Sequence, residues 1–312
     1  MIKTGIYELV QVKQGFKFFK GLFGGEKKLS ITLYDQILNE PNAEELAERI
    51  LQLFADERGA YKRTYAKRFE EFDNEIINLL KQTFSQQEAL LIQDVGVSDA
   101  RTSVDFFVKL ANIFKNLKFE ASDYNPKVYI IEQNNIKLTL SHTGKLLEVV
   151  WPPFVFNFIK RDSYKHYPFN HIIRFIVYFF KIRKILNDYK LGVVKARELL
   201  LFAPNAINLA KQDQRFNLLQ HDLMQPFNNC SHIIRAMNIL NISYFSESEF
   251  NKILNNIYAG LVEQGLLIVG SNQEAGSIVH GGVYKKTNNN FEKIWQSGNG
   301  AAIDDLILQF KL

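Results

Sequence analysis

Apolar residues recur at helical spacing through the first 85 positions. Residues 42–54 and 61–84 place apolar side chains three and four positions apart, which is the pattern of an amphipathic helix. Asn42 and Glu45 have the spacing of a capping box at the start of the first of these segments. We expect residues 1–85 to form a helical N-terminal region that packs on the domain that follows.

From residue 86 onward, short apolar runs alternate with helical patterns. Strands are predicted at residues 89–95, 118–123, 216–222, 231–238 and 265–270. Helices are predicted at residues 103–117, from 204 onward, and at 246–262, where Ser246 and Glu249 have capping-box spacing. Strands separated by helices indicate a parallel sheet with helices on both faces. The predicted class is therefore α/β, with a doubly wound, mostly parallel sheet over residues 86–312.

Two further segments modify this sheet. Residues 277–285 and 291–296 flank the turn residues 288–290, so they predict a hairpin that adds an antiparallel edge. Residues 124–195 interrupt the alternation after the second strand and form a large insertion. Within it, residues 128–150 predict two or three strands around a turn at 142–144, and residues 169–186 predict a very apolar helix.

Composition excludes several classes of protein. The net charge of +5 is modest for 312 residues and does not by itself indicate nucleic-acid binding. Cys230 is the single cysteine, which excludes an intrachain disulfide and a cysteine-based zinc site and favours a reducing, cytoplasmic setting. No run of about 18 apolar residues is present, so no transmembrane helix is expected. No His, Asp or Glu cluster has metal-ligand spacing, and we expect no metal.

Three predicted strands end in or near an acid. Asp94, Asp123 and Asp222 follow the first, second and third strands of the expected sheet. Ligands of open α/β sheets bind outside the carboxyl ends of the strands, where a carboxylate can accept hydrogen bonds from ribose hydroxyls or an adenine amino group. Each Asp taken alone is explained as a cap of a turn or helix. Their joint placement at successive strand ends favours a cofactor that contains a nucleoside.

These residues resemble the motifs of class I S-adenosylmethionine-dependent methyltransferases. The resemblance covers about residues 86–300 without the insertion, and Ser98 and Ala100 stand where the family has the second and third glycines of its Gly-x-Gly-x-Gly loop. It implies a Rossmann-like methyltransferase fold with S-adenosylmethionine as cofactor. Gly96 and its neighbours would contact the methionine part, Asp123 the ribose and Asp222 the adenine. The implied cofactor-binding residues are Asp94, Gly96, Val97, Ser98, Asp123, Asp222, Leu223 and Asn238.

Residues 233–272 are also similar to the chemotaxis-receptor methyltransferases. The similarity is carried by Asn238, by Tyr244 with the following Phe245, and by Gly270 with the following serine. The arginine that this family has immediately before the asparagine is missing, because Arg235 lies three residues earlier. Only the cofactor site is therefore carried over. A nicotinamide cofactor is disfavoured, since Arg101 stands where its loop needs a third glycine.

Methyl transfer needs little from a protein beyond orientation of the activated donor, and a base only where the acceptor has a proton to lose. The candidate catalytic residues are His221, Asn238 and Tyr244, with His232 and His280 as further histidines near strand ends. The predicted function is an S-adenosylmethionine-dependent methyltransferase whose acceptor, small molecule, lipid or protein, is open. The alternative is a non-catalytic methyltransferase-like protein that acts as a membrane-surface or partner-binding module.

The helix predicted at 169–186 is basic as well as apolar. Between residues 160 and 195, nine Lys and Arg residues stand against two Asp. We expect its apolar face to be buried on the domain. The alternatives are a helix lying in a membrane interface, which would make the protein cytoplasmic with peripheral membrane contact, and a lid over the acceptor pocket. Nucleic-acid binding is disfavoured because the aromatic residues follow helical periodicity, which indicates packing.

Overall fold

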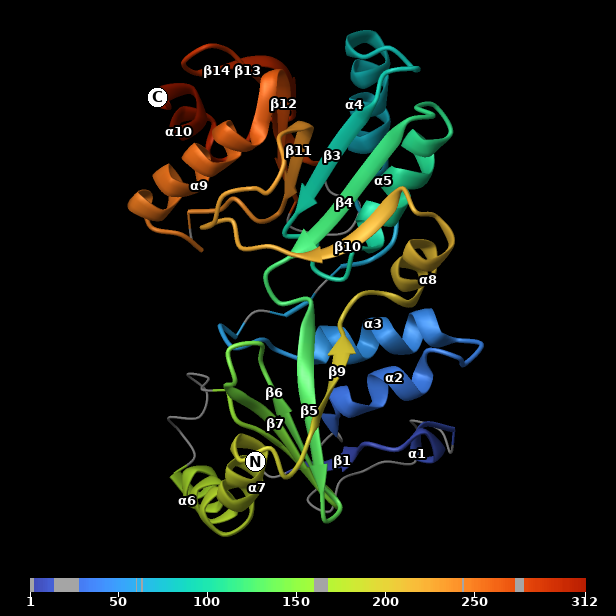
Figure 1. Ribbon diagram of the computed structural model, residues 1–312, viewed down its shortest axis with the longest axis vertical. Coiled ribbons are helices and arrows are strands. Elements are labelled where there is room, and N and C mark those ends of the chain that lie inside the picture. The colour runs from blue at the N-terminus through green and yellow to red at the C-terminus, as the bar shows by residue number, and fades with distance from the viewer. Residues whose placement is uncertain are drawn as a thin grey trace. The chain divides into compact units, whose positions relative to one another are not determined.

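The computed structural model describes residues 3–13, 28–59, 61–62, 64–159, 168–242, 244–272 and 278–312 (Figure 1). The chain divides into two compact units. Unit 1 comprises Met1–Arg63 and Lys127–Pro204, and unit 2 comprises Thr64–Pro126 and Asn205–Leu312. Each unit contains one seven-stranded sheet.

The sheet of unit 2 has the strand order β10-β4-β3-β11-β12-β13-β14. Its strands are β3 (Leu90–Val95), β4 (Leu117–Asp123), β10 (Phe216–Gln220), β11 (Ser231–Met237), β12 (Leu261–Ser271), β13 (His280–Lys286) and β14 (Phe291–Ser297). The first five strands are parallel, and β13 and β14 form the antiparallel hairpin at the edge. The parallel strands follow the order third, second, first, fourth, fifth along the chain, which is Rossmann-like. The predicted doubly wound, mostly parallel sheet is confirmed.

Helices cover both faces of this sheet. They are α4 (Glu70–Thr83), α5 (Arg101–Ala111), α8 (Pro204–Gln212), α9 (Glu247–Gly260) and α10 (Asp304–Gln309). On one face, apolar residues of α9 and α10 form a core with alternate residues of β11, such as Ile234 and Ala236. On the other face, Phe106 and Phe107 of α5 pack on Phe119 of β4. The capping box at the start of α9 is present, because the Ser246 N–H donates to Glu249 Oε2 at 2.8 Å.

The sheet of unit 1 has the order β2-β1-β8-β7-β6-β5-β9. Its strands are β1 (Lys3–Ile6), β2 (Lys28–Leu29), β5 (Lys127–Gln133), β6 (Ile136–Leu140), β7 (Leu146–Trp151), β8 (Phe154–Asn157) and β9 (Ala196–Leu200). Its other elements are α1 (Leu9–Lys13), the 3-10 turn Ile31–Leu33, α2 (Tyr34–Ile37), α3 (Ala43–Leu53), α6 (Pro168–Val177), the π turn Tyr178–Ile182 and α7 (Arg183–Lys190). Core residues of α2 and α3 pack on one face of the sheet, with Val128 and Ile130. Val177, Ile182 and Ile185 pack on the other face.

This division differs from the expected one in two respects. Residues 1–63 do not form a separate helical region but complete the sheet built by the segment 127–204, because β1 pairs antiparallel with β8, with Lys3 opposite Val155. Helix α4, which we expected in the N-terminal region, belongs to unit 2 instead. Strands of four and two residues are too short to show an alternating pattern in the sequence. Helix α5 also begins and ends earlier than the predicted 103–117.

Candidate functional site

The loop between β3 and α5 adopts an unusual backbone at the carboxyl end of the first parallel strand. Gly96, Ser98 and Ala100 have φ angles of 66°, 60° and 64°, so every second residue lies in the left-handed region. A residue with a side chain loses roughly 1–2 kcal/mol there. Backbone hydrogen bonds hold the loop, from the Val97 N–H to Ser122 O (3.1 Å) and from the Ala100 N–H to Val97 O (2.9 Å). The loop therefore has the backbone expected of a Gly-x-Gly-x-Gly turn, although its second and third positions are Ser98 and Ala100.

Asp123 connects this loop to the second strand. Its Oδ2 accepts a hydrogen bond from the Ser98 N–H at 2.8 Å, and its Oδ1 accepts one from the Asn125 N–H at 3.0 Å. The backbone carbonyl of Asp123 accepts the His221 N–H at 3.1 Å, which adds the end of β10. The structure thus brings Ser98, Asp123 and His221 together at the carboxyl edge of the sheet, and the predicted ribose-binding acid lies against the predicted methionine-binding loop.

Asp94 points into the protein. It is 1% exposed, and its Oδ2 accepts hydrogen bonds from Arg235 Nη1 and Ser103 Oγ, both at 2.8 Å. Arg235 is also 1% exposed, and its Nη2 donates to Oδ1 of Asp73 on α4 at 3.0 Å. The carboxylate of Asp94 therefore joins the start of α5, β11 and α4 beneath the loop. Its contribution to a cofactor site would be to hold the loop in place.

The buried cluster of Asp73, Asp94 and Arg235 contains two carboxyl groups and one guanidinium. Burial raises the pKa of the Asp73 carboxyl to about 6, against the opposing effect of Arg235. Burial likewise raises the pKa of Asp94, against Arg235 and Ser103. The guanidinium carbon of Arg235 lies 4.8 Å from the centre of the Phe106 ring, which adds a cation–π contact. Our sequence analysis missed this cluster, although an arginine within the apolar run of β11 needs a buried partner and was the available signal.

Asn238 joins the ends of β11 and β12. Its Oδ1 accepts the Asn272 N–H at 2.9 Å, its own N–H donates to Gly270 O at 2.8 Å, and its φ is 57°. The loop after β3 also touches this region, because a Cβ on Gly96 would lie 2.7 Å from Cγ1 of Ile239. Asn238 and Gly96 therefore lie in adjacent loops, as the predicted site requires.

Arg68 is a further residue of this region that the sequence pattern did not indicate. Its Nε donates to Asn272 Oδ1 at 2.9 Å, so it contacts the residue to which Asn238 is bonded. Burial lowers the pKa of Arg68, while nearby Tyr65 and Tyr244 oppose that effect. Tyr244, which is exposed, thus lies near Arg68 and belongs to the same part of the site. Of these residues, Tyr244 offers an exposed hydroxyl group beside the Arg68–Asn272 contact.

The remaining predicted residues lie further along the edge. Asp222 Oδ1 accepts the Met224 N–H at 3.0 Å within a turn, and Leu223 is buried in the core beside α9. The His221 ring stacks on Phe227 with ring centres 4.4 Å apart, and burial lowers its pKa against the effect of Asp222. β4 and β3 lie between β10 and β11, so these two strands are about 14 Å apart at spacings of about 4.8 Å.

His221 therefore follows the strand three positions along the sheet from the one that precedes Asn238 and Tyr244. His232 is away from this edge, because it lies at the beginning of β11 and its Nδ1 accepts the Leu91 N–H at 3.1 Å. His280 Nδ1 accepts the Asn299 N–H at 2.9 Å at the terminal hairpin. Among the described residues, no group of three or more His, Cys, Asp or Glu is arranged to hold a metal ion.

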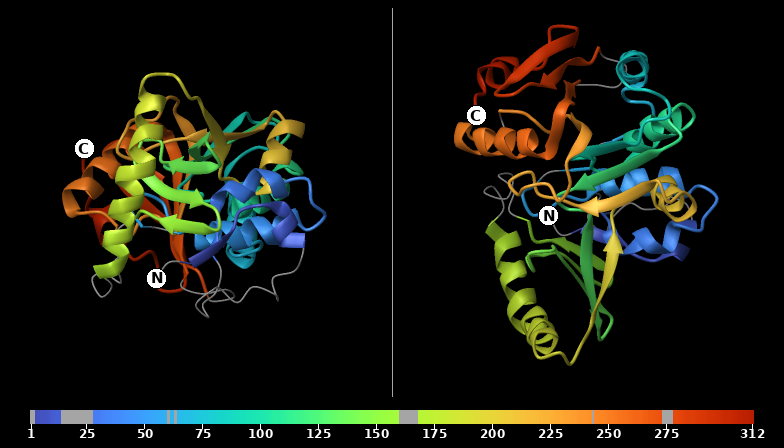
Figure 2. Two further views of the ribbon diagram at one scale, coloured as in Figure 1. Left: turned by 90° about the horizontal axis from the view of Figure 1, so that it is seen from below. Right: turned by 45° about the horizontal axis from the view of Figure 1, so that its top comes forward.

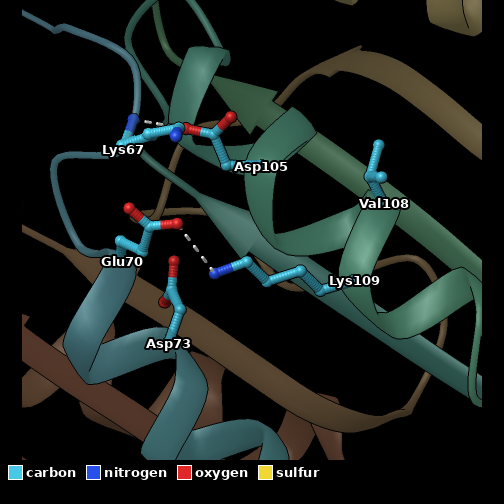
Figure 3. A pocket seen from close by; sticks show the side chains of 6 residues that line it. All are labelled: Lys67, Glu70, Asp73, Asp105, Val108 and Lys109. Atoms are coloured by element: carbon cyan, nitrogen blue, oxygen red, sulfur yellow. Dashed lines mark hydrogen bonds and ion pairs between the residues drawn. The ribbon is translucent and has the colours of Figure 1, made fainter.

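A small pocket of about 210 Å³ lies between α4 and α5 (Figure 3). It is lined by Lys67, Glu70, Asp73, Asp105, Val108 and Lys109. Two of its carboxylates are engaged, since Asp105 Oδ2 accepts the backbone N–H of Lys67 at 2.6 Å and Glu70 Oε1 lies 3.7 Å from Lys109 Nζ. None of the residues predicted to bind the cofactor lines this pocket, but Asp73 connects it with the buried cluster of Asp94 and Arg235.

Comparison with known proteins gives structural similarity alone. No protein-family model matches the chain, and no curated protein matches it. A candidate sarcosine dimethylglycine methyltransferase from Galdieria sulphuraria is similar at 8% identity over 65% of this chain and 47% of that chain, with a TM-score of 0.31. The O-methyltransferase of a Brevibacillus brevis multienzyme, solved with S-adenosylhomocysteine, is similar at 7% identity over 66% of this chain and 48% of that chain, with a TM-score of 0.29. TrmN from Thermus thermophilus is similar at 9% identity over 74% of this chain and 52% of that chain, with a TM-score of 0.34. The chain spans about half the length of each.

Proposed function

We propose that unit 2 binds S-adenosylmethionine at the carboxyl edge of β3, β4 and β11, and that the protein is a methyltransferase. The observation that carries the proposal is the left-handed backbone of Gly96, Ser98 and Ala100 at the first strand of a Rossmann-like sheet. Backbone strain of this kind concentrates at ligand sites. The left-handed backbone of Ser98 and Ala100 costs free energy, and contacts with a bound ligand would offset that cost.

The polar groups at the carboxyl edge of the unit 2 sheet match those that S-adenosylmethionine needs. Asp123 holds the loop through the Ser98 N–H, so one carboxylate lies beside both the loop and the end of β4, where ribose hydroxyls would be bound. Asp222 follows β10 and would face the adenine, while the loop around Gly96 would hold the methionine part. The bound cofactor would supply an activated methyl group on a sulfonium.

The chain's own residues would act mainly by orientation. The Asn238–Asn272 pair and Arg68 form a polar surface beside the loop, and Tyr244 adds an exposed hydroxyl. His221 follows β10 and would lie at the adenine end of the site. The acceptor would therefore be positioned by Asn238, Arg68 and Tyr244, and its chemistry would depend on proximity to the methyl donor.

The second candidate is a non-catalytic protein with a methyltransferase-like sheet that serves as a binding module. The observation that favours it lies in unit 1, where large apolar side chains of α6 and the π turn are exposed. The two candidates differ in one measurable property, because only the first transfers the methyl group of the cofactor.

Calorimetry with S-adenosylmethionine and S-adenosylhomocysteine tests the proposal. We expect both to bind, and Asp123→Asn to weaken binding about tenfold or more, because a charge-assisted hydrogen bond contributes roughly 1.5–3 kcal/mol. Asp213→Asn is the matched control, since Asp213 pairs with Arg215 before β10. If neither ligand binds at about millimolar concentration, which corresponds to only about 4 kcal/mol of binding, the proposal is wrong.

Transfer is measured separately. Protein incubated with methyl-labelled cofactor and cell extract should move label into one of the small-molecule, lipid or protein fractions. Binding of the cofactor without transfer to any fraction supports the non-catalytic candidate. Asp123→Asn that folds normally and binds with unchanged affinity removes Asp123 from the site.

A further inference from the structure

The helix that runs from residue 168 to residue 190 in unit 1 carries its largest apolar side chains on the outside. Ile172 is 55% exposed, Phe175 69% and Phe180 70%, and Ile176 and Phe179 are exposed as well. Among the described side chains of this segment, Val177, Ile182 and Ile185 are buried in the core against the sheet, and Leu186 and Tyr189 pack beside them. The expectation that this apolar face is buried on the domain is therefore wrong, because the segment has two apolar faces and the sheet covers just one.

The exposed residues form one continuous face. Ile172, Phe175, Ile176 and Phe179 follow helical spacing, and the π turn at Tyr178–Ile182 adds a residue to the turn, so that Phe180 joins them. The rings of Phe175 and Phe179 stack with centres 6.2 Å apart, and Phe180 meets Phe179 edge-on at 5.4 Å. Figure 2 shows the segment as one long rod in yellow-green. We call Ile172, Phe175, Ile176, Phe179 and Phe180 the outer face.

Basic residues border the outer face. Lys181, Arg183, Lys184 and Lys190 are exposed on the same segment, and the guanidinium carbon of Arg183 lies 5.7 Å from the centre of the Phe179 ring. Lys181 Nζ lies 5.7 Å from the centre of the Trp151 ring, so a partly exposed tryptophan adjoins this border. The one acid of the helix, Asp188, accepts a hydrogen bond from Gln133 Nε2 within unit 1.

An exposed aromatic face with a basic border is typical of a helix that binds an anionic lipid surface. Long basic side chains can lay their stems along apolar surface and hold their charges at the level of anionic headgroups, while aromatic rings enter the boundary with the acyl chains. A second copy of the same face would bring two basic borders together, which disfavours self-association. Among the described residues, no helix has the length and hydrophobicity needed to cross a bilayer.

We propose that unit 1 docks on an anionic lipid surface through the outer face and its basic border. The helix lies in the plane of the interface, with Phe175, Phe179 and Phe180 inserted and Lys181, Arg183 and Lys184 on the headgroups. This surface is formed by unit 1 alone and does not depend on the cofactor proposed for unit 2.

Vesicle flotation of the full chain tests this proposal. We expect binding to phosphatidylcholine vesicles that contain about one third phosphatidylserine at low salt, and at least tenfold weaker binding to phosphatidylcholine alone or at high salt. Phe175→Ser with Phe180→Ser should lower binding at least tenfold. The matched control is Ile242→Ser with Ile294→Ser, which removes exposed apolar side chains from unit 2 and should leave binding unchanged.

Three results would overturn the proposal. The first is no flotation of the wild-type chain at low salt, and the second is undiminished flotation of the Phe175/Phe180 variant. The third is a wild-type dimer in solution that this variant disrupts, without vesicle binding, because a second copy would then occupy the face. Circular dichroism checks the fold of each variant, and cofactor affinity, measured in parallel, should be the same in the Phe175/Phe180 variant and the wild type.

Discussion

The buried cluster beneath the loop predicts an unusual pH dependence of stability. Asp73 and Asp94 share the single guanidinium of Arg235, and all three side chains are at most 3% exposed. With both carboxyl groups ionised, the cluster carries one excess negative charge in a region of low dielectric. We consider Asp73→Asn, which removes that excess charge with little change of shape and leaves the Asp94–Arg235 pair intact.

The sign and size of the effect follow from the raised pKa. The pKa of Asp73 rises from 3.8 to about 6 on folding, so the folded chain binds a proton more tightly than the unfolded chain. This stabilisation is fully present below the unfolded pKa and is lost as the pH rises through the folded pKa. One pKa unit corresponds to about 1.4 kcal/mol. Because pH 5 lies about one unit below the folded pKa, the wild type should lose about 1.4 kcal/mol between pH 5 and pH 8.

Asn at position 73 does not titrate, so the free energy of unfolding of Asp73→Asn should gain about 1.4 kcal/mol relative to wild type over the same interval. The smaller repulsion on Asp94 acts in the same direction. The assay is urea unfolding followed by the fluorescence of Trp295, whose ring packs edge-on against Phe72 of α4 with centres 5.5 Å apart. A Trp151→Phe background leaves Trp295 as the single tryptophan, so the signal reports unit 2.

Asp213→Asn is the control with the opposite sign. Its hydrogen bond with Arg215 lowers the pKa of Asp213, so its stabilisation is lost only as the pH falls below the ordinary range of a carboxyl group. Its difference from wild type should stay constant between pH 5 and pH 8. If the Asp73→Asn difference is equally constant, Asp73 does not titrate in this interval, and the inferred excess charge of the cluster is wrong.

Two further predictions concern the candidate site. Gly96→Ala should lower the free energy of unfolding by roughly 1–3 kcal/mol, because the residue has a φ of 66° and its new Cβ would meet Ile239. A double-mutant cycle with Ile239→Ala should recover part of that loss, and strict additivity of the two substitutions would contradict the contact. Burial lowers the pKa of His221, so His221 contributes stability above its unfolded pKa that is lost as the pH falls. Its ring proton should titrate in NMR spectra below the ordinary value of 6.5, and a midpoint at or above that value would show that the ring is not desolvated.

The parts of the fold that could be predicted are those with a local signal. The run at residues 89–95 became β3, and the pair of runs around residues 288–290 became the hairpin of β13 and β14. Ser246 and Glu249 formed their capping box because both partners lie within one helical turn. Each of these elements depends on residues close together in the chain, and so the sequence pattern sufficed.

The parts that could not be predicted depend on distant partners. The pairing of β1 with β8 joins residues about 150 positions apart, and no local pattern of four residues indicates it. The helix at 168–190 has enough apolar residues for two faces, yet periodicity does not say which face meets the sheet. In the structure Val177, Ile182 and Ile185 do so, and the aromatic residues remain outside.

The three acids at the strand ends illustrate the same limit within the candidate site. Asp94, Asp123 and Asp222 occupy equivalent places in the sequence pattern, but their partners differ: a buried arginine 141 positions away, the backbone of the β3–α5 loop, and a turn two residues ahead. Asp94 and Asp123 both stabilise the β3–α5 loop. Asp94 accepts a hydrogen bond from Ser103 at the start of α5, and Asp123 accepts one from the Ser98 N–H within the loop. Left-handed conformations at Ser98 and Ala100 together cost roughly 2–4 kcal/mol, and these two carboxylates help to keep the loop in that shape. The shape of the β3–α5 loop therefore depends on the partners of Asp94 and Asp123, which only the folded chain brings together.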